Sequence, residues 1–332
     1  MSLLVRDYPG PHERDSMVRR LFDTPVPLAE LEASLCRLDE RFHDTLVPSR
    51  ELKVADDGRL LVGGEAHRLQ PRALDQLAAR LKVPASYLRR CPTDLQAHNL
   101  NRWLGQLHST VLVRFDSQSV RALLSDRYQP VSNLEMVRSM LRAVPEDTPV
   151  RYELTGSLFV AQVLTPGYRQ RGIHGGMNIV NSETGHAVVR LSALLFRTIC
   201  LNGLIMGDQE VSLRRRHTHD AQKTLEELTG MAELAWGRVA GFPGRLEGTR
   251  TIRIAEPEPV FDKIAERYGL GPPQRRAIGE AFQVEPGLSL FEVINAVTRA
   301  ANFERLPLEE RTELQEVGGR ILQLAEGGYR WL

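Results

Sequence analysis

The stretch from Gly175 to Asp220 decides the fold, and it reads GGMNIVNSETGHAVVRLSALLFRTICLNGLIMGDQEVSLRRRHTHD. Apolar residues recur along 177–181 and 187–195, which is typical of strands. The turn at 183–185 ends in glycine, and short turns of this kind join antiparallel strands. The stretch therefore predicts a hairpin within an antiparallel sheet. A helix is the alternative for part of 190–199.

Further elements are predicted on both sides of this hairpin. Strands are expected at 110–115, 119–124, 150–154, 157–164 and 211–215, and helices at 221–239, 258–268, 273–282, 289–301 and 307–325. Ser132 followed by Glu135 is a capping box that predicts a helix start, and Asp220 is the expected N-cap of the helix after it.

This pattern divides the chain into four parts. Residues 1–15 are expected to be a flexible arm, 16–107 a mostly helical region with a β-hairpin, 108–219 a β-rich core, and 220–332 a helical region. The predicted fold class is α+β, with a central antiparallel sheet between N-terminal and C-terminal helical regions.

Two interpretations fit the helical region before residue 108. Apolar residues have helical spacing along 28–42 and 70–81, and 52–62 is the expected hairpin. The joint at 81–84 predicts either a helix-turn-helix, which would carry Arg89 and Arg90 to a major groove, or an ordinary helical hairpin. Pro92 closes the second helix early, which favours the hairpin.

Composition excludes several classes of protein. The 332 residues are 42% hydrophobic and 26% charged, with a net charge of +1, as expected of a globular chain with two or three subdomains. No apolar run approaches the ~20 residues of a membrane span. Three scattered cysteines fit a reducing compartment and no disulfide frame. We therefore expect a cytoplasmic location, no membrane, no cofactor and no metal.

Positive charge gathers in the predicted sheet. Residues 151–219 hold eight arginines and four carboxylates, while 220–332 hold fourteen basic and eighteen acidic residues. A basic face can attract polyanions even on a nearly neutral chain. Ordinary scatter of charge is the alternative explanation.

Arginine and tyrosine make this charge a candidate nucleic-acid surface, because guanidinium groups hold phosphates and rings stack on bases. In a strand, Arg214 and Arg216 would share one face and Arg215 the other. The alternative is a solvated strand end with an exposed loop. The candidate residues are Arg127, Tyr128, Tyr168, Arg169, Arg171, Arg214, Arg215, Arg216 and His217.

Catalytic and metal-binding patterns are weaker. Cys200 could be a nucleophile if Arg197 or His217 stabilised its thiolate, but a buried cysteine at a strand end is the simpler interpretation. His217 and His219 lack a carboxylate at ligand spacing, so no catalytic or metal-binding residue is predicted.

Several short motifs, in this order, resemble one known family. They are Ser125-Asp-Arg-Tyr128, Asn181-Ser-Glu-Thr-Gly185, Arg197-Thr-Ile-Cys-Leu-Asn-Gly203, the Arg-Arg-Arg-His-Thr block at 214–218, and Asn295-Ala-Val-Thr298. Together, over roughly residues 110–325, they are similar to the phage/plasmid-like proteins grouped as domain of unknown function 932. The resemblance implies an association with phages, prophages and plasmids, and no established activity.

The resulting prediction is a nucleic-acid-binding accessory of a mobile element, with single-stranded DNA as the expected partner and annealing as one activity. Single-strand annealing proteins form rings, so a homo-oligomer is compatible with this prediction. Two alternatives stay open. One is an enzyme that acts on nucleotides or nucleic acid, with Glu183, Cys200, Asn202 and His217 at one end of the sheet. The other is a protein-interaction module, such as an inhibitor or host-takeover factor.

Overall fold

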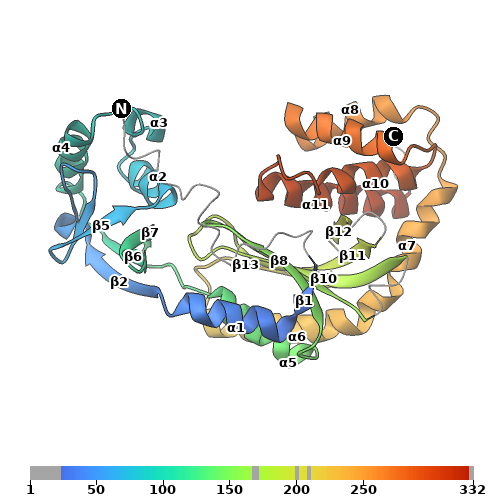
Figure 1. The fold of residues 1–332 in the computed structure, drawn as a ribbon, viewed down its shortest axis with the longest axis horizontal. Coiled ribbons are helices and arrows are strands. Elements are labelled where there is room, and N and C mark those ends of the chain that lie inside the picture. Colours follow the sequence, from blue (N-terminus) through green and yellow to red (C-terminus); the bar gives the residue numbers. More distant parts are fainter. Residues whose placement is uncertain (1–23, 167–171, 199–201, 208–210, 329–332) are drawn as a thin grey trace.

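Two β-sheets organise the computed structural model, which describes residues 24–166, 172–198, 202–207 and 211–328 (Figure 1). The larger sheet has seven strands in the order β1-β8-β9-β10-β11-β12, and β13 pairs with β11 beside β12. All of its pairs are antiparallel. Its strands are β1 (Val26–Pro27), β8 (Pro149–Leu154), β9 (Phe159–Leu164), β10 (Ile173–Asn181), β11 (Val189–Arg197), β12 (Asn202–Met206) and β13 (Ser212–Arg215).

The smaller sheet has six strands in the order β2-β6-β7-β5-β4-β3. Its only parallel pair among the described strands is β5 with β7. The strands are β2 (Phe42–Pro48), β3 (Lys53–Val54), β4 (Leu60–Val62), β5 (Glu65–Leu69), β6 (Thr110–Asp116) and β7 (Ser119–Ser125), with a short 3-10 turn at Ser49–Glu51. We call residues 42–125 the N-terminal lobe and the remainder of the described chain the core lobe.

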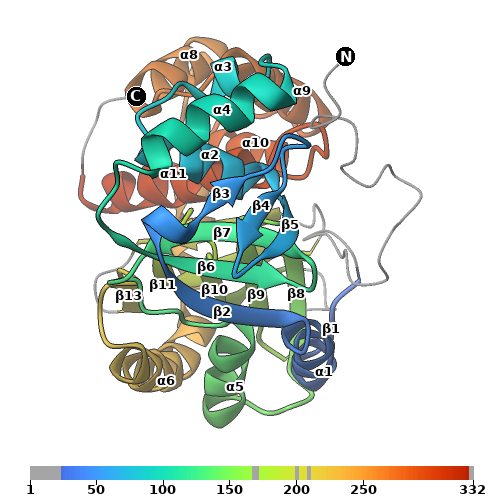
Figure 2. The ribbon, with the colours of Figure 1, turned by 90° about the vertical axis from the view of Figure 1, so that its left-hand side faces the viewer.

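Helices cover both sheets (Figures 1 and 2). The N-terminal lobe carries α2 (Pro71–Arg80), α3 (Ala85–Leu88) and α4 (Thr93–Leu104). Below the larger sheet in both views lie α1 (Leu28–Asp39), α5 (Asn133–Ala143) and α6 (Ala221–Arg238). The chain then continues through α7 (Pro243–Gly248), α8 (Pro257–Tyr268), α9 (Pro272–Val284), α10 (Leu290–Ala300) and α11 (Leu308–Glu326), with 3-10 turns at Val239–Gly241 and Thr249–Thr251.

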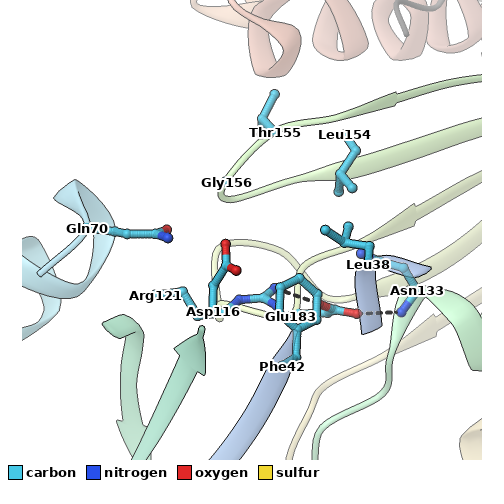
Figure 3. Close-up of a pocket in the computed structure, with 10 residues that line it drawn as sticks. All are labelled: Leu38, Phe42, Gln70, Asp116, Arg121, Asn133, Leu154, Thr155, Gly156 and Glu183. Atoms are coloured by element: carbon cyan, nitrogen blue, oxygen red, sulfur yellow. Dashed lines mark hydrogen bonds and ion pairs between the residues drawn. The ribbon is translucent and has the colours of Figure 1, made fainter. Parts of the chain in front are cut away.

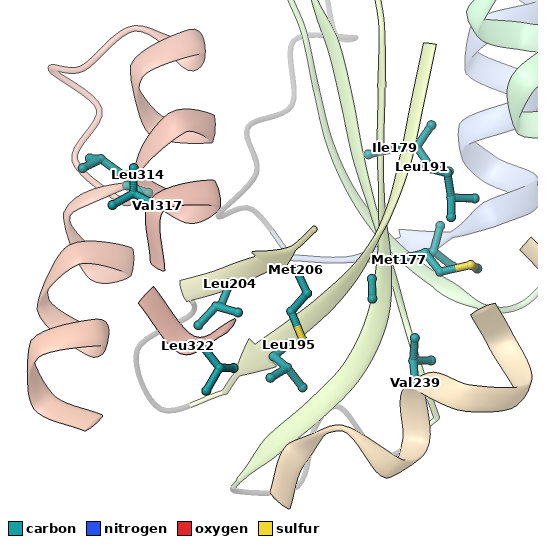
Figure 4. Packing of buried hydrophobic residues seen from close by; sticks show 14 of the residues in the cluster. Met177, Ile179, Leu191, Leu195, Leu204, Met206, Val239, Leu314, Val317 and Leu322 are labelled. Carbon is teal, nitrogen blue, oxygen red and sulfur yellow. The ribbon is translucent and has the colours of Figure 1, made fainter. Parts of the chain in front are cut away.

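Each lobe has its own hydrophobic core. The core of the N-terminal lobe lies between its sheet and helices α2 and α4. The core of the other lobe is continuous from α1, α5 and α6 to α10 and α11. Figure 4 shows a part of it in which Leu204 and Met206 of β12 lie beside Leu195 of β11 and Leu322 of α11.

A pair of glycines sets how closely α11 approaches the larger sheet and α10. A Cβ on Gly319 would lie 1.9 Å from the carbonyl oxygen of Ile205, and one on Gly318 would lie 2.3 Å from a methyl group of Thr298. No side chain fits against a backbone atom at that distance. Gly319 therefore lets α11 lie directly on β12, and Gly318 lets it lie against α10.

Local signals for the ends of the helices are confirmed. The Ser132 hydroxyl accepts a hydrogen bond from the Glu135 backbone N–H, and the reciprocal bond closes the capping box of α5. Asp220 caps α6 in the same way, accepting from the backbone N–H of Lys223. The four helices predicted after residue 257 are all present, each within two residues of its expected ends.

Two predictions about strands and helices are wrong, one alternative is excluded and one strand was missed. Phe42 begins β2 instead of ending the first helix, because 42–48 pairs with β6. Strands β6 and β7, expected in the central sheet, pair instead with strands of the N-terminal lobe. The helical alternative within 190–199 is excluded for 190–197, which lie in β11, and strand β12 was not anticipated. The contacts that decide the first two cases are distant in sequence, whereas β12 pairs with the neighbouring β11.

The helical hairpin, and not the helix-turn-helix, is present in the N-terminal lobe. Helix α3 has only four residues, which is too short to serve as a recognition helix. Arg89, which follows it, forms an ion pair with Asp75 of α2. Helix α2 in turn packs on β7. No helix in the described part of the chain is long and apolar enough to cross a membrane.

Candidate functional site between the two lobes

The loop between β10 and β11 joins the two lobes. Its residues 181–184 are buried, and Gly185 closes the turn with a φ of +72°, a conformation that favours glycine. A Cβ at Gly185 would also lie 2.7 Å from the side chain of Leu124 in the N-terminal lobe. The turn predicted from the sequence is therefore also a contact between lobes.

Glu183 is the charged centre of this loop. One carboxylate oxygen accepts a hydrogen bond from the backbone N–H of Asn133, 2.7 Å away at the start of α5. The other accepts from Nη2 of Arg121 at 2.5 Å. The side chains of Arg121 and Glu183 are only 9% and 3% exposed. The helix N-terminus and the guanidinium both stabilise the buried negative charge.

A β-bulge directs Arg121 toward this carboxylate. Phe115 pairs with Val120 but Arg114 pairs with Ala122, so Arg121 is the extra residue in β7. Bulges of this kind re-aim a side chain. The face of its guanidinium lies 3.8 Å from the centre of the Phe42 ring, which adds a cation–π contact.

Other side chains of the N-terminal lobe bind the carbonyl groups of the same loop. Arg114 donates to the backbone carbonyl oxygen of Glu183 at 2.6 Å, and Gln76 donates to the backbone carbonyl oxygen of Thr184 at 2.8 Å. Arg72 donates to the carbonyl oxygens of Thr184 and Gly185. A buried turn leaves backbone carbonyls without partners. Here the second lobe supplies those partners, so the loop and the lobe contact depend on each other.

Tyr128 and His217, two of the predicted binding residues, lie on the far side of this loop. The Tyr128 hydroxyl donates to the Ser182 carbonyl at 2.7 Å, and its ring stacks on His217 with centroids 4.8 Å apart. Burial lowers the pKa of His217, although backbone groups of Gln129 and Ala187 oppose this effect. Neither ring nitrogen of His217 makes a well-formed hydrogen bond among the described residues. Each ring covers a face of the other, which supports a structural role for both.

This stacking brings the predicted arginines of two segments together. Arg127 precedes Tyr128 and Arg216 precedes His217, and the backbone N–H of Gln129 donates to the His217 carbonyl. Arg127, Arg214 and Arg216 are exposed and form no ion pair with any described residue. We call these three residues the arginine surface.

The remaining predicted binding residues do not belong to this surface. Arg215 forms an ion pair with Glu227 of α6 at 2.5 Å. Arg190, which lies opposite Arg214, pairs with Glu316 of α11. Arg214 therefore lies on the same face of the sheet as Arg190, and Arg215 lies on the opposite face, toward α6. This alternation is the one predicted from the sequence. Tyr168, Arg169 and Arg171 lie outside the described residues.

A cleft lies beside the Arg121–Glu183 ion pair, between the two lobes (Figure 3). Its inner cavity has a volume of about 160 Å³, and an outer pocket of about 290 Å³ shares Gln70, Thr155 and Gly156 with it. In Figure 3 the Gln70 amide and the Asp116 carboxylate point into the inner cavity, opposite Leu38 and Leu154. Pockets at the boundary of two structural units are common ligand sites.

A second polar cluster lies at the opposite end of β11. Arg197 holds both carboxylate oxygens of Glu285 at 2.6 Å and donates to the Asn295 side chain. The Asn202 amide donates to Asn295 and Thr298. The cluster joins β11 and β12 to α10, and most of its hydrogen bonds are buried, so its geometry is structural.

The catalytic grouping considered from the sequence is not formed. Arg197 pairs with Asn202, while Val189, at the other end of β11, pairs with Arg215 two residues before His217. Eight residues of strand separate these ends by ~26 Å. Asn202 thus lies far from His217 and Glu183, and Cys200 is outside the described residues. The described side chains include no group of three or more His, Cys, Asp or Glu residues that could hold a metal ion.

Comparison with known families agrees with the resemblance seen in the motifs. Residues 122–258 match the model of a family described as a domain of unknown function (DUF932). The chain contains a DUF932 domain. No curated protein and no solved structure matches the chain.

The DUF932 match begins within β7 and ends at the start of α8. Four of the five motifs lie inside it, and Asn295–Thr298 lies beyond its end. In the structure, the motifs at 125–128, 181–185 and 214–218 meet at the lobe contact. The motif at 197–203 meets Asn295 and Thr298. The resemblance therefore corresponds to two sets of contacting residues.

Sequence reasoning missed Arg72, Gln70 and Arg121. One signal was present, since Arg121 interrupts the otherwise apolar run of β7. A charged residue inside a buried strand needs a partner. Gln70 and Arg72 carry no such signal, because they read as the ordinary start of a helix.

Proposed function

We propose that the protein binds single-stranded nucleic acid through the arginine surface of Arg127, Arg214 and Arg216. The observation that supports this function is that all three are exposed and lack ion pairs with described residues. Elsewhere, Arg114, Arg121 and many other arginines hold carboxylates. Guanidinium groups without carboxylate partners are available for phosphates.

The geometry favours contacts with the phosphates of the nucleic acid over contacts that recognise particular bases. The stacked rings of Tyr128 and His217 position the loops that carry Arg127 and Arg216, and their contact faces are not available to bases. Helix α3 is too short to enter a groove. A surface of this kind binds phosphates with little sequence preference and with strong salt dependence.

The biological role that we propose is that of an accessory protein of a mobile element, acting on single strands by binding or annealing and without catalysis. The family resemblance supports this role. Assembly into a homo-oligomer is part of the proposal, since annealing requires two strands to be held close together. Sedimentation velocity with and without a single strand tests the assembly.

Fluorescence anisotropy with a labelled single strand of about 30 nucleotides, at about 50 mM salt where phosphate-driven binding is strong, tests the binding. Wild-type protein is expected to bind, and the R127A/R214A/R216A variant to bind at least tenfold more weakly. The matched control is R90A/R102A/R276A, which removes the same charge from exposed arginines without ion pairs among the described residues. Absence of wild-type binding, or equal losses in both variants, would refute the proposal.

A further inference from the structure

The inner cavity of the inter-lobe cleft contains polar groups without partners. The Gln70 side chain makes no hydrogen bond with any described residue, although it points into the cavity (Figure 3). Nη1 of Arg121 is buried and donates to no described acceptor, while the side chain as a whole is more than nine-tenths buried. A buried donor without an acceptor is costly, so a ligand that supplies an acceptor here would be stabilised.

The walls of this cavity suit a flat heterocycle. Leu38 and Leu154 line one side and Phe42 lies at the base. Its two ion pairs, Arg121 with Glu183 and Asp116 with Arg41, leave it without a large excess charge. Apolar walls with a few hydrogen-bonding groups of both kinds are how proteins hold an unstacked base.

The outer pocket has different chemistry. Arg72 lines it, and its guanidinium is bound to carbonyl oxygens only, so no carboxylate neutralises it. The first turn of α2 starts at Pro71 in the same pocket and contains no acidic residue. A helix N-terminus beside a cation favours a phosphate group.

We propose that the inter-lobe cleft binds a nucleotide, with its base in the inner cavity and its 5′-phosphate in the outer pocket. Charge fixes this orientation. At the inner end the carboxylates of Asp116 and Glu183 are paired with Arg41 and Arg121, which leaves no net positive charge for a phosphate. In the outer pocket the Asp75 carboxylate is paired with Arg89, so Arg72 and the start of α2 supply the unneutralised positive charge. The outer pocket is near the lower limit of ~300 Å³ for ligand pockets. None of the arginine surface lines the cleft, so this proposal does not depend on strand binding.

Calorimetric titration of the full chain with each ribonucleoside 5′-monophosphate, the matching nucleosides and inorganic phosphate tests the site. At least one monophosphate is expected to bind with a Kd below about 1 mM, and its nucleoside and inorganic phosphate at least tenfold more weakly. The proposal fails if no monophosphate binds, or if inorganic phosphate binds as tightly as the monophosphates.

Two variants locate the binding without threatening the fold. Pro71→Glu places a negative charge where it stabilises a helix N-terminus but repels a phosphate, so monophosphate affinity should fall to that of the nucleoside; Pro71→Ala is its control. Gln70→Leu should weaken nucleoside and monophosphate alike, because it removes the amide that faces the base; the fold loses no contact, since the Gln70 side chain makes no hydrogen bond with any described residue. Binding that is unchanged in both Pro71→Glu and Gln70→Leu would overturn the assignment to this cleft.

Competition identifies the source of the nucleotide and separates the two proposals. R127A/R214A/R216A protein is expected to keep full affinity for the monophosphate. If a short strand with a 5′-phosphate displaces the monophosphate and the same strand without it does not, the cleft takes a strand end. If neither displaces it, the ligand is a free nucleotide. Loss of monophosphate binding in the triple variant would contradict two separate sites.

Discussion

Glu183 of the core lobe and Arg121 of the N-terminal lobe form a buried ion pair, with 2.5 Å between Oε2 and Nη2. The pair closes the contact between two sheets that are separate in the hydrogen-bonding pattern. The backbone N–H of Asn133 binds the second carboxylate oxygen. The start of α5, the bulge of β7 and the turn after β10 thus meet at one carboxylate.

Replacing Glu183 by alanine should therefore destabilise the protein strongly. It leaves the Arg121 guanidinium buried without a counter-charge, which typically costs about 3–5 kcal/mol. Urea unfolding measured by circular dichroism gives the free energy of unfolding. The control is Glu280→Ala, which breaks the exposed pair with Arg305 and should cost less than about 1 kcal/mol. Equal losses in the two variants would contradict the role of the buried pair.

His217 should make stability fall in mild acid. Burial keeps its pKa in the folded protein below the ordinary value of 6.5, so the unfolded chain takes up a proton first as the pH falls. The free energy of unfolding then decreases from about pH 7 through 6.5 until the lower folded pKa is reached. His217→Phe keeps a ring against Tyr128 and removes the titration. Its stability should depend less on pH between about 7.5 and 5, and parallel curves for the two proteins would refute this explanation.

Two glycines in helices should respond oppositely to alanine. Gly319→Ala places a methyl group against the backbone of β12, and overpacking of this kind costs about 1–3 kcal/mol or more. Gly279, within α9, has open space at the same position. Gly279→Ala should stabilise the protein by about 0.5–1 kcal/mol. Thermal unfolding of both variants measures the difference, and a loss of stability in Gly279→Ala would contradict it.

Neighbouring arginines of β13 should differ in their effect on nucleic-acid binding. Arg214 has no ion pair among the described residues, whereas Arg215 is neutralised by Glu227. The plot of log affinity against log salt should lose about 0.7 of its slope in Arg214→Ala, the value for one phosphate contact on a single strand. Arg215→Ala should leave the slope unchanged. Anisotropy titrations at several salt concentrations measure both, and equal slopes in the two variants would refute the proposed surface.

Much of the helical structure could be predicted because its signals are local. Ser132 with Glu135, and Asp220, mark helix starts through hydrogen bonds that span three residues. The polar turn at 183–185 likewise marks the junction of β10 and β11. The placement of β6 and β7 could not be predicted, since β6 pairs with β2, some seventy residues earlier in the chain, and β7 pairs with β5, about fifty residues earlier.

The candidate site shows the same division. The arginines at 214–216 can be recognised in the sequence as a basic block. Only the structure shows that Arg215 is paired with Glu227, and that the stacked rings of Tyr128 and His217 bring the segments of Arg127 and Arg216 together. The inter-lobe cleft has no sequence pattern at all. Gln70 precedes a helix, and Asp116 and Leu154 each end a strand. These positions in the sequence do not indicate that the three residues line one cavity.

The sequence by itself determined the α+β class, the helix ends, the hairpin of β10 and β11 and the match of residues 122–258 to the DUF932 domain, because periodicity, capping and short motifs are properties of neighbouring residues. Only the tertiary structure decided that the chain forms two lobes and that the turn at 181–185 fastens them. A buried carboxylate requires a counter-charge and hydrogen-bond donors from wherever the fold can supply them. For Glu183 these come from Arg121 and Asn133, about sixty and fifty residues away, and no local pattern encodes that meeting.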